Sequence, residues 1–253
     1  MPNFMMWTIE NKSHLDKGIS DYVERIFSLT LNHISQRLGF QPPLGVKPIV
    51  LIYDCNHGPI VYWPLKQDKY EIGLCVEGIF PHQIIYQMAH ELCHIYIDPR
   101  VNGTLIEIVC QKTGLDILEE IGASLTHAGQ AGVDKYISDL RLSAEANKNF
   151  TVQQLDPNSL FRRIKELEST NTLYDRDYNN LLAFKLKEII DPIDKLGLIK
   201  SIRDSITPKP PDDITDLNTN ANTQVNFDEL IQNIKIDNIK LAEALADIKK
   251  NWA

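Results

Sequence analysis

Apolar residues recur at helical spacing early in the chain, over residues 15–38. Val23 and Ile26 lie on the apolar face of this stretch, and Gly39 provides a stop after it. His33 falls on the same face, where a histidine more often belongs to the core than to a metal site. The pattern therefore predicts a first amphipathic helix with a buried His33.

The spacing then changes to short β-branched or alternating runs. Residues 48–53 form an apolar run of strand length, residues 60–63 a second, and residues 70–76 alternate as a third. A turn at 56–59 places His57 in the loop between the first two runs. We expect a small mixed sheet in this part of the chain.

Two helices with strong apolar stripes follow. The first is bounded by Phe80-Pro81, with proline in the first turn, and by Asp98-Pro99 at its end. The second covers residues 104–121. The apolar face of the first helix consists of Ile84, Ile85, Met88, Leu92 and Ile95. Such a stripe predicts a buried helix.

Further helices are predicted over residues 134–147, 158–169, 175–190 and 193–206. Residues 207–226 contain prolines and polar residues with almost nothing to bury, which predicts a flexible linker. A capping sequence at 226–229 begins a last amphipathic helix over 227–253. This helix either packs on the body of the protein or binds a protein partner, and packing is the simpler expectation.

Composition is that of an ordinary globular protein, with 43% hydrophobic and 24% charged residues. A net charge of -8 without a basic stripe argues against nucleic acid as a partner. No apolar run is long enough to cross a bilayer and no export signal is visible, so no membrane association is expected. The four cysteines form no CxxC pair, which predicts reduced thiols in a cytoplasmic protein, with Cys93 and Cys110 buried.

The candidate chemistry lies in the first of the two striped helices, where His90-Glu91-Leu92-Cys93-His94 is an HExxH sequence. Residues four apart stack on one face of a helix, so both imidazoles can bind one cation. Glu91 lies about a hundred degrees around the helix and can instead take a proton from a water on the metal. The motif predicts a zinc site rather than two core histidines.

A catalytic zinc takes three protein ligands and keeps one position open for water. Arg100 stands where the three-histidine class has its third histidine, so a carboxylate is the expected third ligand. Glu107 follows His94 after twelve residues and has apolar neighbours. Burying its carboxylate among them is costly unless a cation lies beside it, and the alternative is that the side chain faces solvent. Glu107 is the predicted ligand, and Asp98, Glu119 and Glu120 are the alternatives.

Together with Leu105-Ile106-Glu107-Ile108-Val109-Cys110, the motif resembles the gluzincin branch of the HExxH metallopeptidases, over roughly residues 15–125. The resemblance implies an α+β, zincin-like catalytic domain over 1–205, with its core over 1–125 and a mostly helical subdomain over 126–205. It implies one Zn²⁺ held by His90, His94 and Glu107, with Glu91 as general base in peptide-bond hydrolysis.

The resemblance also implies a peptide or protein substrate lying along the strand over 70–76, taken as the edge of the sheet. A residue that stabilises the oxyanion is expected as well, and the candidates are Tyr174, Arg176, Tyr178 and His127. Two other functions stay open: a non-catalytic or regulatory zincin-like binding module, and a zinc hydrolase of a non-peptide amide. An intact Glu91 favours catalysis, because a purely structural site has no use for a free carboxylate beside the metal.

Overall fold

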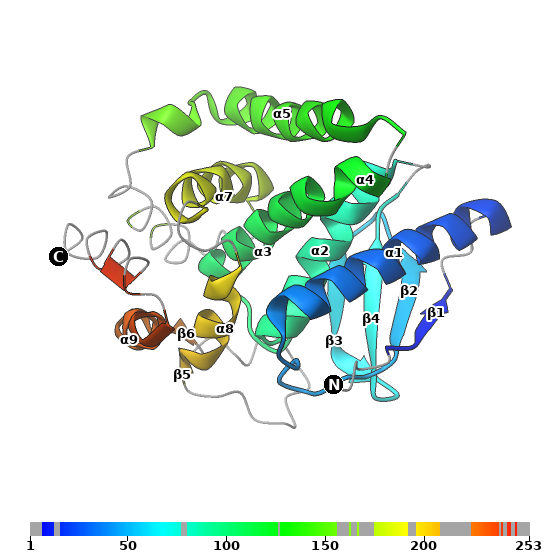
Figure 1. The fold of residues 1–253 in the computed structure, drawn as a ribbon, viewed down its shortest axis with the longest axis horizontal. Helices are drawn as coiled ribbons and strands as arrows, with labels where there is room; N and C mark the ends of the chain where they lie inside the picture. The colour runs from blue at the N-terminus through cyan, green and yellow to red at the C-terminus, as the bar shows by residue number, and fades with distance from the viewer. Residues whose placement is uncertain are drawn as a thin grey trace.

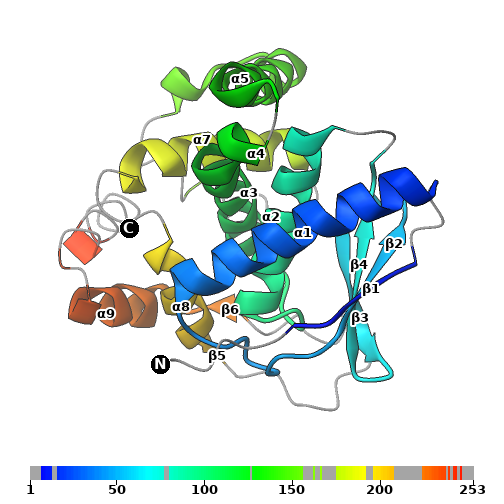
Figure 2. The same cartoon turned by 45° about the vertical axis from the view of Figure 1, so that its right-hand side comes forward.

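The computed structural model describes residues 7–12, 16–76, 80–125, 127–155, 162, 166, 175–191, 196–207, 224–237, 239, 242, 243 and 246. Within this part the chain is a mixed α+β protein that is mostly helical (Figure 1). The sheet lies on one side of the molecule, and the helices after α3 lie on the other side (Figures 1 and 2).

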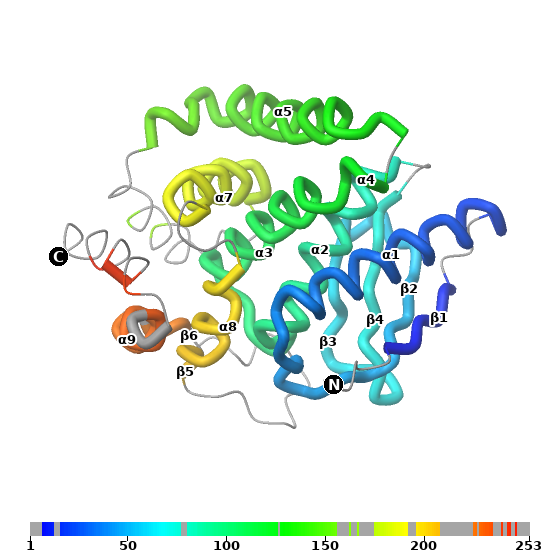
Figure 3. The backbone as a smooth tube through the Cα atoms, in the orientation of Figure 1, coloured from blue at the N-terminus to red at the C-terminus, as the bar shows by residue number. Residues whose placement is uncertain are grey.

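Four strands form a mixed sheet in the order β1-β2-β4-β3 (Figure 3). β1 (Ile9–Asn11), β2 (Ile49–Tyr53) and β4 (Lys69–Leu74) are parallel, and β3 (Ile60–Lys66) is antiparallel to β4. The three strands predicted between residues 48 and 76 are all present. β1 was not predicted, since three residues carry too short a pattern to detect.

The edge of the sheet next to β4 is β3, so the prediction that residues 70–76 form the edge strand is wrong. β4 lies between β2 and β3, because β2 pairs in parallel with β4, with Ile49 opposite Tyr70. Proline cannot donate to a ladder and is confined to edge strands or bulges, so Pro64 within β3 already marked this strand as an edge.

One face of the sheet is buried beneath α1 (Lys17–Leu38) and α2 (Pro81–Ile97), and α1 crosses the strands in Figure 1. Ile49, Leu51 and Ile72 are fully buried on this face. Gly39 ends α1 in the left-handed conformation, as its sequence predicts. The apolar stripe of α2 is buried as expected, and so is every residue from Ile84 to Ile97.

α3 (Thr104–Ile117) packs along α2 and continues into a π-helical turn, Leu118–Gly122, and then α4 (Ala123–Leu125). The helix predicted over 104–121 is therefore confirmed, with a change of helix type near its end that periodicity does not reveal. α7 (Arg176–Ile190) packs on α3, and α5 (Gly129–Lys148) packs on α7 (Figures 1 and 2).

The remaining elements form a small layer beside the lower end of α2. They are α8 (Gly197–Asp204), the strand pair β5 (Ile206–Thr207) and β6 (Gln224–Val225), and α9 (Phe227–Asp237). A 3₁₀ turn at Val152–Gln154 packs separately on α7. α9 packs on α8 with Leu230 and Ile234 buried, which is the docked arrangement expected for the last helix. Apart from residues 162 and 166, the helix predicted over 158–169 lies outside the described residues. Residues 208–223 of the predicted linker also lie outside them.

A buried network of charges joins α3 to α7. Lys112 lies 2.5 Å from Asp116 on its own helix and 2.8 Å from Asp191 at the end of α7. Lys187 of α7 lies 2.8 Å from both Asp116 and Glu119. Since breaking a buried ion pair leaves an uncompensated charge, these contacts fix α7 against α3. No helix in the part of the chain described above is long and apolar enough to cross a membrane.

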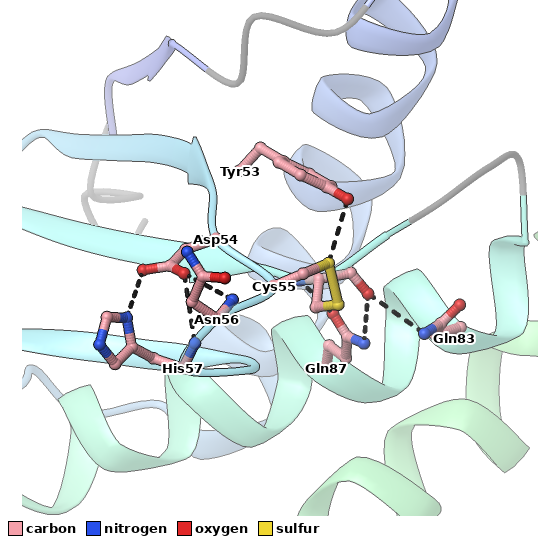
Figure 4. Close-up of a disulfide and its surroundings, with 8 residues drawn as sticks. Tyr53, Asp54, Cys55, Asn56, His57, Gln83 and Gln87 are labelled. Atoms are coloured by element: carbon pink, nitrogen blue, oxygen red, sulfur yellow. Dashed lines mark hydrogen bonds and ion pairs between the residues drawn. A yellow bond between two sulfur atoms is a disulfide. The ribbon is translucent and has the colours of Figure 1, made fainter.

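A disulfide joins Cys55 to Cys75, so the expectation that all four thiols are reduced is wrong (Figure 4). The two cysteines follow the adjacent parallel strands β2 and β4, which brings them together in space. Their spacing along the chain does not predict this proximity. Disulfides persist mainly in oxidising compartments, so the inference of a cytoplasmic protein from reduced thiols loses its basis. Cys93 and Cys110 are free and buried, as predicted.

Replacing both Cys55 and Cys75 with alanine is expected to lower the free energy of unfolding by about 3 kcal/mol, the loop-closure value for a crosslink of this span. Urea unfolding with and without a reducing agent measures the effect. A reducing agent should lower the midpoint of the natural chain but leave the double variant unchanged. Equal midpoints for the natural chain under both conditions would contradict the prediction.

Candidate metal centre

The paired histidines and Glu107 meet between two neighbouring helices. His90 and His94 lie one turn apart on α2, and their Nε2 atoms are 3.2 Å from each other. Glu107, in the first turn of α3, directs its two carboxylate oxygens at them, with Oε2 3.5 Å from His90 Nε2 and Oε1 3.4 Å from His94 Nε2. Three groups predicted from sequence therefore face one point.

These separations fit a small tetrahedral cation. With zinc bonds of about 2.0–2.1 Å and tetrahedral angles, neighbouring ligand atoms lie about 3.3–3.4 Å apart. The two imidazole Nε2 atoms, 3.2 Å apart, are close to that value, and each lies 3.4 or 3.5 Å from a different oxygen of the Glu107 carboxylate. The site is also nearly enclosed, since His90 and His94 are 8% and 7% exposed. The residues present thus fit a zinc ion.

The carboxylate of Glu91 lies next to the two histidines as well, with a ligand atom within 4.8 Å of theirs, so geometry alone would also allow it near a metal ion. Its Oε1 is 3.7 Å from His90 Nε2, and its side chain is 2% exposed. That oxygen is buried with no hydrogen-bond partner among the described residues, while the carboxylate accepts a hydrogen bond from the backbone N–H of Val61 in β3. A buried oxygen left unpaired is costly, so the position of Oε1 indicates that it accepts a hydrogen bond from a bound molecule.

Burial shapes the acid–base properties of the cluster. Burial raises the pKa of Glu91 to about 7, against the opposing effect of His90. Burial lowers the pKa of His94 to about 4, which favours the neutral imidazole that a metal requires. Burial also tends to raise the pKa of Glu107, but the two histidines outweigh it and lower the pKa, so this carboxylate is the ionised one.

The alternative third ligands are engaged elsewhere. Asp98 is paired with Arg100 at 2.8 Å, and Glu119 with Lys187 at 2.8 Å. Glu120 lies 2.7 Å from His33 Nε2 and also binds Arg37. The side chain of His33 is 28% exposed and is not part of the core, so the prediction of a buried His33 is wrong. It pairs with Glu120 because α1 meets the π-helical turn at this point.

The cluster opens into a cleft of about 720 Å³ between β3 and the helices α5 and α7. One wall consists of residues 59–61 at the start of β3, and α2 and α3 form the floor. Tyr86 of α2 lies one turn before His90, and the single proton of its hydroxyl faces two acceptors, Oε1 of Gln111 in α3 and, at 3.0 Å, Oδ1 of Asn180 in α7. These three buried polar residues went unnoticed in the sequence, since nothing in their spacing connects them.

The loop before β3 forms the rim of the cleft and is held in place from several sides. Asp54 accepts hydrogen bonds from the backbone N–H groups of Asn56 and His57 and lies 2.8 Å from His57 Nδ1 (Figure 4). Gln87 of α2 binds the backbone of Cys75 on the other side of the disulfide, with its Nε2 2.9 Å from the carbonyl oxygen. His57, predicted in a loop, lines the cleft.

Of the four candidates for stabilising an oxyanion, Arg176 lines the cleft. Tyr178 instead packs on Phe150 and beneath Lys148, and His127 is exposed in a turn outside the cleft. Tyr174 lies outside the described residues.

Comparisons of the chain with protein-family models, with curated proteins and with solved structures give no match.

Proposed function

We propose that the chain is a zinc-dependent hydrolase of peptide bonds with a zincin-like fold and a gluzincin-type site. One observation carries this proposal: the buried, unpaired Oε1 of Glu91 beside two histidines whose Nε2 atoms both face the carboxylate of Glu107. A structural zinc site is closed by four protein ligands and needs no free base. Three ligands with a separate carboxylate beside them favour hydrolysis.

His90, His94 and Glu107 would hold one Zn²⁺, which when bound polarises the scissile carbonyl group and makes a water molecule a better nucleophile at neutral pH. Glu91 accepts the proton of the attacking water and delivers it to the leaving amine. The hydrogen bond from the Val61 N–H fixes one side of the Glu91 carboxylate and leaves the other free for this transfer.

The substrate peptide is expected along β3. Ile60 and Val61 line the cleft, and β3 is an edge strand whose outer backbone groups face away from β4. An extended peptide can add to such an edge by backbone pairing, with its side chains alternating between the cleft and the rim. The corrected strand order therefore moves the expected substrate position from β4 to β3, directly beside Glu91.

Metal analysis paired with a cleavage screen tests the proposal. The purified chain is expected to contain one zinc per molecule and to cleave members of a random peptide pool, detected by mass spectrometry. Dialysis against a chelator should abolish cleavage, and added zinc should restore it. Stoichiometric zinc without cleavage would instead support a non-catalytic binding module, and cleavage of small amides alone would point to a non-peptide substrate. A chain that binds no zinc would rule the proposal out.

A further inference from the structure

Arg176 is the one lysine or arginine among the described residues that line the cleft. It begins α7 and reaches across to the opposite rim, where its Nη2 lies 2.5 Å from the position that a Cβ on Gly58 would occupy. Gly58 also has a φ of +75°, a conformation that other residues rarely adopt. The loop at Gly58 therefore leaves room for the guanidinium at the mouth of the cleft.

Arg176 has a charge but no partner among the residues described here. It is close enough to Glu91 and Glu107 to act on them electrostatically, yet it forms no ion pair with either. The nearest acidic residue on its own helix, Asp177, accepts a hydrogen bond from Asn147 Nδ2 at 3.0 Å. The five N–H donors of the guanidinium are thus available to a ligand.

The charge balance of the loaded site leaves Arg176 in excess. Two neutral histidines, the carboxylates of Glu91 and Glu107 and one Zn²⁺ sum to zero charge. The positive charge of Arg176 is then not needed to neutralise the protein's own carboxylates. Asp177 also lines the cleft and offsets this charge in the overall sum, but its carboxylate accepts a hydrogen bond from Asn147, so the guanidinium of Arg176 is a local positive group that favours an anionic ligand.

A second donor lies on the same side of the cleft. Asn180 is four residues after Arg176 on α7, so the two side chains share one face of the helix. The Asn180 Oδ1 lies 3.0 Å from the Tyr86 hydroxyl, whose proton it shares with Gln111 Oε1, and in this orientation the NH₂ group of Asn180 is the donor at the other side of its amide. The buried charge network of Lys112 and Lys187 holds α7 in place, so both donors have fixed positions.

We propose that Arg176, assisted by Asn180, binds a carboxylate of the substrate and makes the protein selective for peptides that carry one in the cleft. The carboxylate can be the C-terminus of the peptide or an acidic side chain. This inference rests on the proposed peptide-hydrolase function. It differs from a role for Arg176 at the oxyanion, which would affect every peptide equally.

Binding and cleavage of matched peptide pools test the proposal. The probes are fluorescein-labelled hexapeptide pools of neutral residues, made as C-terminal acids or amides, and amide pools with one Glu or one Gln. Fluorescence anisotropy measures their binding to zinc-loaded Glu91→Gln protein, and mass spectrometry measures their cleavage by the natural chain. One of the two carboxylate-bearing pools is expected to bind about tenfold more tightly than its neutral counterpart, as for a charged hydrogen bond.

The variants separate recognition from other roles. Arg176→Gln should reduce the preference to within about twofold while leaving binding of the neutral pools unchanged, and Arg176→Lys should retain part of it. Arg141→Gln is the matched control, since Arg141 pairs with Glu145 outside the cleft, and it should keep the full preference. Thermal unfolding should be the same for the two Arg176 variants and the natural chain, because Arg176 is exposed.

Equal affinity of the natural chain's site for acidic and neutral pools would overturn the inference, and so would an equal loss for both pools in Arg176→Gln. Absence of binding to every pool would overturn it as well. If instead no pool is cleaved but the Arg176-dependent preference persists, carboxylate recognition stands and the hydrolase proposal fails. If all pools are cleaved at equal rates, the hydrolase proposal stands and carboxylate recognition by Arg176 fails.

Discussion

Replacing Glu91 with glutamine is expected to lower the rate of peptide hydrolysis by about a thousandfold, within the range for loss of a general base. Glutamine has the same shape and can still accept the Val61 N–H through its amide oxygen, but it cannot take a proton from water. Initial rates on a peptide cleaved by the natural chain, with zinc content measured on the same sample, give the result.

Measurements on the variant itself and on a control variant exclude other causes of a lost activity. The variant should bind one zinc and unfold no more readily than the natural chain, because it removes a buried charge whose burial raises the pKa to about 7. Glu188→Gln, on the outer surface of α7 beside Lys185, is the matched control and should keep full activity. Unchanged activity in Glu91→Gln would show that the proton goes to another group.

Replacing Glu107 with alanine is expected to weaken zinc binding by more than about 100-fold, because losing a residue that only hydrogen-bonds to a metal ligand already costs up to that much. Both histidines remain in this variant, but the third ligand is lost and the ion must complete its shell with water. Competition with a colorimetric zinc chelator measures the affinity. Hydrolysis at limiting zinc should fall in parallel.

The other acidic residues near the end of α3 supply the controls. Glu119→Ala and Glu120→Ala remove carboxylates that pair with Lys187 and with His33, and zinc affinity should be unchanged in both. Glu107→Gln serves as a second variant that keeps the size of the side chain if alanine disturbs packing. Undiminished zinc affinity in both Glu107 variants would exclude this residue as a ligand.

The candidate site was largely predictable from sequence because its main constraint is local. His90 and His94 share a helix face whatever surrounds the helix, and Pro81 and Asp98 mark the ends of that helix. Glu107 could be proposed because a carboxylate among apolar neighbours needs a partner. Its actual position depends on α3 packing along α2, which no spacing in the sequence specifies.

The features that were missed or wrong are those set by contacts between distant segments. The Cys55–Cys75 bond and the position of β4 inside the sheet both follow from the parallel pairing of β2 with β4, across the whole of β3. The pairing of His33 with Glu120 joins α1 to the end of α3, 87 residues away. Among these features, the edge position of β3 alone has a local signal in the sequence, because Pro64 within this strand cannot donate a hydrogen bond to a neighbouring strand.

The complete burial of α2 from Ile84 to Ile97 has a consequence for the exchange of the ion. Among the described residues, the sheet, α1, α3 and α8 pack around this helix, so an ion held as proposed between His90, His94 and Glu107 would enter and leave through the cleft. The peptide is expected to use the same opening. With the proposed zinc and peptide, loading would have a required order, the ion first and the peptide second, and an occupied cleft would slow the release of the ion.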